Sequence, residues 1–203
     1  MKLYYAPGAC SLSPHIVLCE AELPFELIKV DLQEKKTETG EDFRTVNPNG
    51  YVPVLVLDDG RQLTEGPAII QYIADQAPGK RLAPEAGTFE RYNLQQWLNF
   101  ISTELHKTYS PLFNANMPAE AKALFRGTLA SRFQWVADQV ASQPYLLGSD
   151  FTVADAYLFV MLRWGKLMAI DISRWPPLVQ YQNKIADRPA VKRAQQEEGL
   201  GAG

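Results

Sequence analysis

Apolar and polar residues follow two different periods along the chain, and the period changes near residue 78. Before that point, short runs with the spacing of strands alternate with stretches that have the spacing of helices. We expect strands at residues 3–5, 25–30, 54–57 and 61–64, helices at 11–22 and 65–75, and a weak helix before Asn47. Strands separated by helices favour parallel pairing, and the turn at 58–60 predicts an antiparallel hairpin at one edge. The first part is therefore expected to be a small α/β domain, at residues 1–78.

After a connector at 79–87, only helical spacing remains, so the segment 88–203 is expected to be an all-helical domain. The expected helices are 88–109, 119–142, 153–167, 178–187 and 190–197. Thr152 and Asp155 have the spacing of a capping box at the start of one of them. Ser11 or Ser13 is expected to cap the helix at 11–22.

Composition and charge narrow the class of protein. Of the 203 residues, 46% are hydrophobic and 21% are charged, which is typical of a folded globular protein. The net charge of −3 and the lack of a basic run argue against binding to nucleic acid or to an anionic membrane. Neither a run of eighteen apolar residues nor a signal peptide is visible, so we expect a cytoplasmic location. Two cysteines, Cys10 and Cys19, favour a reducing compartment over a disulfide framework.

Cys10 stands where the loop after the first expected strand enters the first expected helix. Unpaired peptide NH groups and the helix dipole at that position would stabilise a thiolate and lower the pKa of the thiol. The alternative is a small buried residue without a chemical role, which is the interpretation we prefer for Cys19. No second cysteine follows three residues after Cys10, so a redox cycle would need an external thiol. We find no metal-ligand spacing and expect no metal.

Two short motifs in the first domain have both a functional and a structural interpretation. A cis bond between Val52 and Pro53 would direct the Val52 backbone outward, where an extended peptide could pair with it, but a trans bond is commoner. Glu65 and Gly66 precede a helix, where a carboxylate and unpaired NH groups could together hold a zwitterion. Simple capping of that helix is the alternative.

In the second domain, Asn99, Thr103 and His106 recur at i, i+4 and i+7 on a helix that is otherwise apolar on more than one side. Such a polar line must face water, a polar ligand or another subunit. For His106 the alignment favours a site, whereas His15 is expected on the surface or in the core. Trp164 belongs to an aromatic cluster that is mostly core, and it could instead line an apolar ligand pocket.

Four motifs in this order resemble the cytosolic glutathione transferases, and the resemblance covers the whole chain. Three of them are residues 51–55, 63–69 and 151–157. The fourth is the combination of residues 7–13 with residues 104–107, which resembles the bacterial beta class in particular. The resemblance implies an α/β thioredoxin-like N-terminal domain and an all-α C-terminal domain with a hydrophobic substrate pocket. It also implies a cytoplasmic homodimer that conjugates reduced glutathione, its co-substrate, to small hydrophobic electrophiles in detoxification and xenobiotic metabolism, without a metal.

The same resemblance implies roles for individual residues. Cys10 would lie nearest the glutathione sulfur, with a hydrogen bond or a mixed disulfide to it, and His106 would assist as a second catalytic residue. The Val52 backbone would pair with the cysteinyl part before a cis bond at Pro53. Trp164 would line the hydrophobic substrate pocket. The residues implied to bind glutathione are Ala9, Cys10, Lys35, Tyr51, Val52, Pro53, Glu65, Gly66, Asn99, Thr103, Glu104, Leu105, His106 and Lys107.

Within this set, Lys35 would reach the glycyl carboxylate, while Glu65 and the Gly66 NH would hold the γ-glutamyl end. Many members of the family carry Ser where Gly66 stands, so one hydroxyl contact is missing here.

Two other functions stay open. The first is a glutathione-dependent thiol–disulfide reductase or reductive dehalogenase that uses a Cys10 mixed disulfide. The second is a non-catalytic protein that binds hydrophobic ligands, although Cys10, Glu65 and His106 together argue against it.

Overall fold

The computed structural model describes residues 1–201 and divides the chain into two compact units. The first unit joins Met1–Leu82 to the C-terminal segment that starts at Arg188, and the second is Ala83–Asp187. The last helix was expected in the helical domain and instead belongs to the first unit. The reason is its apolar face: α8 (Pro189–Glu197) packs on α1 (Leu12–Ala21), where Val191 and Ala194 are buried. Periodicity predicts such a helix but not the partner that it packs against.

A five-stranded sheet forms the centre of the first unit. Its order is β3-β2-β1-β4-β5, built from β1 (Lys2–Tyr5), β2 (Glu26–Asp31), β3 (Lys36–Thr37), β4 (Val54–Val56) and β5 (Gln62–Leu63). The strands β1 and β2 are parallel, and the β4–β5 hairpin is antiparallel, both as expected. However, β4 runs antiparallel to β1, so the parallel pairing expected for that strand is wrong. The chain between β2 and β4 forms the edge strand β3 and one 3-10 turn, Phe43–Thr45, in place of a crossover helix.

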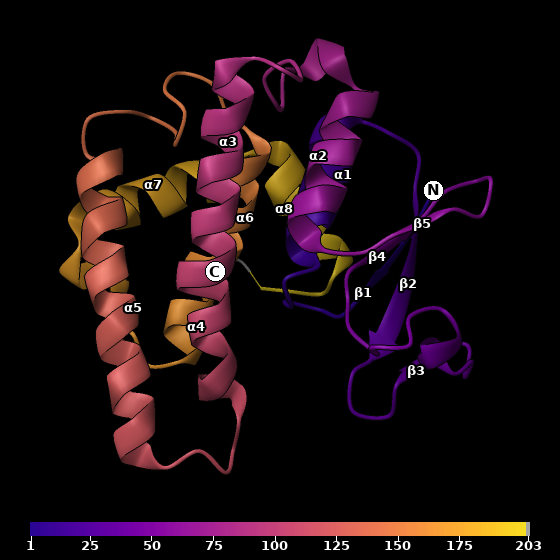
Figure 1. Cartoon of the computed structure of the whole chain (residues 1–203), viewed down its shortest axis with the longest axis horizontal. Helices are drawn as coiled ribbons and strands as arrows, with labels where there is room; N and C mark the ends of the chain where they lie inside the picture. The colour runs from indigo at the N-terminus through magenta and orange to yellow at the C-terminus, as the bar shows by residue number, and fades with distance from the viewer. Residues whose placement is uncertain (202–203) are drawn as a thin grey trace. The chain divides into compact units, whose positions relative to one another are not determined.

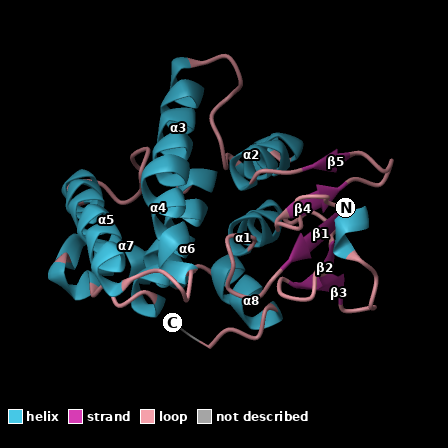
Figure 2. Ribbon diagram, turned by 60° about the horizontal axis from the view of Figure 1, so that its bottom comes forward, coloured by secondary structure: helices cyan, strands magenta, loops and turns pink. Residues whose placement is uncertain are grey.

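Both faces of this sheet are covered. Helices α1 and α2 (Gly66–Gln76) lie on one face (Figure 2), and Leu3 of β1 is fully buried. On the other face, Phe43 is buried in a cluster with apolar residues of the strands and loops, and its ring centroid lies 5.6 Å from that of Tyr4. Alternation along β1 therefore sends successive side chains to two different apolar layers.

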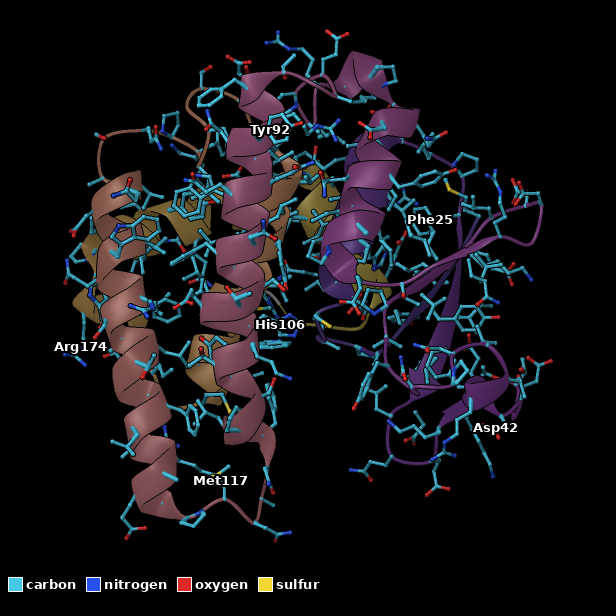
Figure 3. The ribbon with its side chains drawn as sticks, in the orientation of Figure 1. Phe25, Asp42, Tyr92, His106, Met117 and Arg174 are labelled. Atoms are coloured by element: carbon cyan, nitrogen blue, oxygen red, sulfur yellow. The ribbon has the colours of Figure 1, made fainter. Side chains whose placement is uncertain are left out.

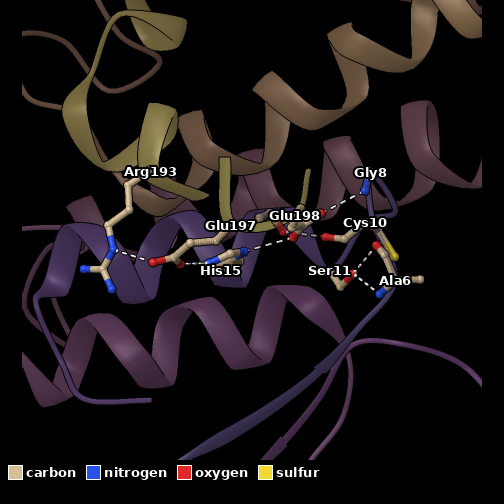
Figure 4. Close-up of polar contacts among 9 residues, drawn as sticks. Ala6, Gly8, Cys10, Ser11, His15, Arg193, Glu197 and Glu198 are labelled. Carbon is tan, nitrogen blue, oxygen red and sulfur yellow. Dashed lines mark hydrogen bonds and ion pairs between the residues drawn. The ribbon is translucent and has the colours of Figure 1, made fainter. Parts of the chain in front are cut away.

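A buried ionic contact holds α8 to α1 (Figure 4). The His15 ring has no exposed surface; its Nδ1 lies 3.0 Å from Glu198 Oε1 and its Nε2 lies 2.7 Å from Glu197 Oε2. The second oxygen of Glu198 accepts a hydrogen bond of 2.8 Å from the Gly8 NH. Of the two locations expected for His15, the structure gives the core. The C-terminal end of α8 thus holds both the first helix and the loop that precedes it.

The second unit is helical (Figure 1), as the period of the sequence predicts. Its helices are α3 (Phe89–Phe100), α4 (Lys107–Tyr109), α5 (Ala119–Val140), α6 (Val153–Leu167) and α7 (Pro176–Ala186). Helix α6 is buried along most of its length, including Tyr157, Phe159 and Trp164, which confirms that the aromatic cluster is mainly core. Within residues 1–201, no helix combines the length and the apolar character that a membrane crossing requires.

The capping box at the start of α6 is confirmed. The Thr152 NH donates a hydrogen bond of 2.8 Å to Asp155 Oδ2, and the Asp155 carboxylate also accepts from the Tyr181 hydroxyl at 2.6 Å and from the Leu146 NH at 2.8 Å. Burial raises the pKa of Asp155, and these donors act in the opposite direction. One buried carboxylate thus joins the start of α6 to α7 and to the preceding loop.

The expected single helix at 88–109 is interrupted. Residues Ile101–His106 form a π-helical turn between α3 and α4, and the NH of Lys107, which follows it, bonds to the Ser102 carbonyl five residues back. Phe89 and Tyr92, which the apolar pattern would place in the core, are 73% and 60% exposed. They lie in the first turns of α3, where the other helices of this unit do not bury them.

The contact at His15 predicts a pH dependence of folding. Burial opposes the charged imidazole, but hydrogen bonds to Cys19, Glu198 and Glu197 outweigh it and raise the pKa of His15 from 6.5 to about 9. A raised pKa in the folded state stabilises the fold fully below pH 6.5, and this contribution is lost as pH rises through about 9. The shift corresponds to about 3 kcal/mol in the free energy of unfolding.

Denaturant unfolding of the wild type between pH 6 and 10 is therefore expected to show this loss, and the His15→Gln variant is expected to lack most of it. His106→Gln serves as the matched control, because burial lowers the pKa of His106 to about 4 and leaves it uncharged throughout this range. Equal slopes for wild type and His15→Gln would contradict the assignment.

Candidate functional site

Cys10 lies in the loop between β1 and α1, two residues before the first residue of the helix. Its side chain is half-buried, and its Sγ donates to the carbonyl oxygen of Val52 at 3.4 Å. Ser11 does not cap α1 with its side chain, in contrast to the expectation; its Oγ bonds to the NH and the carbonyl of Ala6, at 3.1 Å and 3.2 Å. Ser11 thus closes the loop that holds Cys10.

Burial determines the protonation of Cys10. Removal from water raises the pKa of the thiol to about 12, although the NH groups of Cys10 and Ser11 act in the opposite direction, and the carboxylate of Glu65 raises it further. The expectation of a lowered pKa at the helix N-terminus is therefore wrong. Loss of hydration and a nearby negative charge outweigh the partial charges of two peptide groups. At neutral pH, Cys10 is a thiol that can donate a hydrogen bond.

The loop before β4 meets Cys10 and carries the expected cis bond between Val52 and Pro53. Lys35 lies against the same loop, because its Nζ donates to the carbonyl oxygen of Gly50 at 2.9 Å and stands 5.7 Å from the centre of the Tyr51 ring. The Tyr51 ring itself is 70% exposed. An ammonium group and an exposed aromatic ring therefore lie at the loop whose Val52 carbonyl contacts the Cys10 sulfur.

The N-terminus of α2 completes this part of the site. Glu65 precedes the helix with a φ of 65°, a conformation that residues with a side chain rarely adopt. Its carboxylate is exposed and acts on the pKa of Cys10. A Cβ atom built on Gly66 would lie 3.9 Å from Cγ of Pro53, so α2 begins directly beside the loop that carries the cis bond. The first NH groups of a helix lack intrahelical acceptors and attract anions.

In the first unit, the residues that the sequence indicated are thus brought together. Ala9, in the loop before Cys10, is half-buried against the apolar cluster that contains Val52. The resulting arrangement offers a thiol donor, free backbone groups, a carboxylate and an ammonium group within one region. It can bind a small extended peptide that has charged groups of both signs.

In the second unit, the predicted residues differ in their surroundings. Asn99 and Thr103 are exposed, and the Thr103 hydroxyl donates to the carbonyl of Asn99 at 3.0 Å. The carboxylate of Glu104 forms an ion pair of 2.7 Å with Arg132, and the Leu105 side chain is buried within its own unit. Lys107, the last of this set, is exposed.

His106 projects from the segment that continues α3 (Figure 3) and has a partner that the sequence did not indicate. Its Nδ1 lies 2.6 Å from the Tyr157 hydroxyl, and its ring packs edge to face against Trp164, with centroids 5.1 Å apart. Burial, and to a lesser extent the charge of Lys107, lower the pKa of His106 to about 4. A neutral imidazole paired with a phenol can accept or pass on a proton.

Trp164 is only 6% exposed and also packs against Tyr109 and Phe113, with ring centroids 5.6 Å and 5.0 Å away. Its ring is thus mainly core of the second unit, and Phe113, which is half exposed, carries the aromatic cluster to the surface. Spacing could not reveal the Tyr157 contact, because the π-helical turn at Ile101–His106 changes which residues share a face of the helix.

Comparisons with known proteins show the family of the chain. The N-terminal domain of glutathione S-transferases matches residues 8–76, and their C-terminal domain matches residues 119–192. The glutathione S-transferase GstA of Escherichia coli O157:H7 is 44% identical over 200 residues, which is 98% of this chain and 100% of that protein. A solved ternary complex of BphK, a bacterial glutathione S-transferase, is 60% identical with a TM-score of 0.97, over 98% of this chain and 100% of that one.

Two further solved structures are each 48% identical with a TM-score of 0.96, over 99% of this chain and 100% of the other. One is a bacterial beta-class glutathione S-transferase of Sphingomonas chungbukensis, and the other is a sphingomonad glutathione S-transferase in complex with glutathione. The chain belongs to the glutathione S-transferases. Within that family it is a bacterial beta-class enzyme with glutathione S-transferase activity.

The raised pKa of Cys10 gives a direct test. Alkylation of Cys10 by iodoacetamide in the ligand-free enzyme is expected to be slow at neutral pH and to rise without a plateau up to pH 10, because only the thiolate reacts. Mass spectrometry of the peptide that contains Cys10 measures the rate and separates it from that of Cys19. Glu65→Gln is expected to speed the reaction at each pH, because it removes a negative charge near the sulfur. A plateau reached near pH 7 would mean that the thiol is ionised there.

Proposed function

We propose that the chain conjugates reduced glutathione to hydrophobic electrophiles, with Cys10 as a hydrogen-bond donor to the glutathione sulfur. The observation that carries this proposal is the position of the Cys10 Sγ just before α1, where it donates to the Val52 carbonyl at 3.4 Å beside the cis bond to Pro53. The Cys10 thiol and two peptide NH groups can all donate hydrogen bonds to the sulfur of bound glutathione. These donors stabilise the negative charge of a glutathione thiolate, because they are in place before the charge forms. The glutathione thiolate is then the nucleophile that attacks an electrophilic carbon, and the leaving group departs with its electron pair.

Binding requires one exchange of partners at Val52. In the ligand-free structure, the Val52 carbonyl accepts from Cys10. We propose that the cysteinyl NH of glutathione takes this acceptor, which frees the Cys10 thiol to turn to the glutathione sulfur. The same event would therefore fix the peptide backbone and provide the donor for its sulfur.

The charged ends of the peptide find partners of opposite sign in the same unit. Glu65 would take the γ-glutamyl ammonium, and the Gly66 NH would take the neighbouring carboxylate. Lys35, whose Nζ is now bonded to Gly50, would turn to the glycyl carboxylate beside the Tyr51 ring. The roles implied for Asn99, Thr103, Glu104, Leu105, His106, Lys107 and Trp164 stay predictions, and of these His106 has the supporting geometry of a neutral imidazole held by Tyr157.

A glutathione-dependent reductase or reductive dehalogenase is the second candidate, because Cys10 is accessible enough to form a mixed disulfide. In that reaction the Cys10 thiolate attacks a disulfide sulfur, or external glutathione resolves a disulfide formed on Cys10. The high pKa of Cys10 opposes the first of these steps in the ligand-free enzyme. Conjugation, which needs only the Cys10 thiol as a donor, is therefore the function that we favour.

The homodimer, the cytoplasmic location and the role in detoxification are proposals as well. The exposed rings of Phe89 and Tyr92, at the start of α3, support an interface with a second copy of the chain. Sedimentation of the wild type beside a Tyr92→Glu variant tests the interface.

Substitutions of Cys10 separate the two reactions. Cys10→Ser keeps a hydrogen-bond donor and is expected to retain conjugation of an aryl halide close to the wild-type level. Cys10→Ala lacks the donor and is expected to lose about tenfold in kcat/KM, which corresponds to one hydrogen bond to a charged sulfur. Reduction of a mixed disulfide, measured in the same samples, is expected to disappear in both variants. Equal conjugation by wild type and Cys10→Ala would contradict the role of Cys10 as a donor.

Gly66 provides a gain-of-function test of the peptide site. Its backbone has no positive φ, and a Cβ atom would meet only Pro53 at an ordinary 3.9 Å, so a side chain fits. Gly66→Ser is expected to lower the Kd for glutathione about threefold to tenfold, because it adds one hydroxyl donor beside the bound carboxylate. Gly66→Ala fills the same space without a hydroxyl and is the matched control. Calorimetric titration measures the three values, and equal affinities for the Ser and Ala variants would place the γ-glutamyl end elsewhere.

A further inference from the structure

A second cluster of reactive side chains lies between α1 and α8, and Cys10 is not part of it. His15 and Cys19 are one helical turn apart on the same face of α1, and both are buried. Glu197, the last residue of α8, reaches the same point from the other helix. One donor atom from each of these three side chains lies within 4.8 Å of the other two.

We propose that His15, Cys19 and Glu197 form a binding site for a transition-metal dication of the Zn²⁺ type, with Glu198 orienting the His15 ring. The site would bridge the first helix of the chain to its last. Its donors are a ring nitrogen, a sulfur and a carboxylate oxygen.

The donor set selects the class of metal. Zn²⁺ and Co²⁺ accept imidazole, thiolate and carboxylate ligands together, whereas Mg²⁺ and Ca²⁺ require oxygen ligands. Three protein ligands leave one position of a tetrahedron for a water molecule. The cluster is therefore suited to a borderline-soft ion and unsuited to the hard cations.

The distance between the His15 and Glu197 donor atoms requires only a small movement on metal binding. The His15 Nε2 and the Glu197 Oε2 stand 2.7 Å apart, joined by a hydrogen bond. Two ligands bound at about 2.0–2.2 Å in tetrahedral geometry stand about 3.4 Å apart, so the carboxylate has to retreat by less than about 1 Å. The Glu197 side chain is one-third exposed, so it can move and can admit an ion from solvent. Figure 4 shows Glu197 between His15 and Arg193.

Glu197 uses its two oxygens for different partners. Oε1 accepts from Arg193 at 2.8 Å, and Oε2 faces His15. A metal can therefore replace the proton on the His15 side while the ion pair with Arg193 stays in place.

The second nitrogen of the His15 ring is bound by a carboxylate, as is common for histidines that bind a metal. Its Nδ1 faces the buried carboxylate of Glu198 at 3.0 Å, which leaves Nε2 to face Glu197 at 2.7 Å. Metal-bound histidines nearly always bind a carboxylate or a carbonyl through the second ring nitrogen, which fixes the tautomer and strengthens the ligand. Glu198 is itself fixed, because its other oxygen accepts from the Gly8 NH.

The charges balance when a dication replaces two protons. To bind a metal, the imidazole nitrogen must be free of its proton and the cysteine must be a thiolate, while the carboxylate binds in its charged form. Binding forms bonds from the metal to His15 Nε2, Cys19 Sγ and Glu197 Oε2 and releases one proton from His15 and one from Cys19. The net charge of the buried cluster is unchanged. Because protons compete for the same atoms, affinity rises with pH.

Cobalt titration of the metal-stripped enzyme tests the proposal, because a thiolate bound to Co²⁺ gives a charge-transfer band in the near ultraviolet. The chain has two cysteines and two histidines, and the proposed site holds one of each, so Cys10 and His106 are matched controls. We expect one Co²⁺ per chain, with the band present in wild type, Cys10→Ala and His106→Gln. We expect it to be absent in Cys19→Ala and His15→Gln, with folding checked by circular dichroism.

Further measurements test the site without spectra. Zn²⁺ added to the wild type at weakly buffered neutral pH is expected to release about two protons per ion bound and to raise the Tm until saturation. Glu198→Gln is expected to weaken the affinity about tenfold to a hundredfold, because it weakens the support of the His15 ring. The proposal would be overturned if no charge-transfer band formed with Co²⁺ in large excess. It would also be overturned if the band were present in Cys19→Ala and absent in Cys10→Ala.

Discussion

One carboxylate from the end of α8 holds the first loop of the chain in place. Glu198 binds the Gly8 NH with one oxygen and His15 with the other, and it lies 190 residues beyond Gly8 in the sequence. A buried carboxylate needs such partners, since an unpaired charge inside a protein is costly. The loop that presents Cys10 is therefore fixed at one end by α8 and at the other by Ser11, whose hydroxyl bonds to Ala6.

A rigid loop explains why burial decides the chemistry of the sulfur. Cys10 is held against the Val52 carbonyl and near the Glu65 carboxylate, so loss of hydration and a negative neighbour act on the thiol together. The helix N-terminus, which would favour a thiolate, is the weaker influence. The same peptide NH groups can then serve the sulfur of a bound glutathione, whose negative charge they and the Cys10 thiol would share. In this account the nucleophile is on the substrate, and Cys10 keeps its proton.

Much of this arrangement could be predicted from the sequence. Proline at 53 before an apolar strand, Glu65 and Gly66 before a helix, and Cys10 after a strand are local signals, and the structure brings these residues together in the first unit. The direction of β4 and the location of α8 could not be predicted, because they depend on packing partners far apart in the sequence. The contact between His106 and Tyr157 could not be predicted, because a π-helical turn changes which residues share a face of the helix. The raised pKa of Cys10 could not be predicted either, because it depends on burial of the side chain, which the sequence pattern does not show.

The central claim is that the bound glutathione carries the negative charge and Cys10 does not. Thiolates absorb in the ultraviolet, so difference spectra of the enzyme with saturating glutathione, recorded against pH, measure the ionisation directly. We predict a thiolate signal that titrates well below the pH at which free glutathione ionises, and that has the same amplitude in wild type and in Cys10→Ser. A signal that is present without glutathione, or that disappears in Cys10→Ser, would show that the thiolate is Cys10 and would contradict the account.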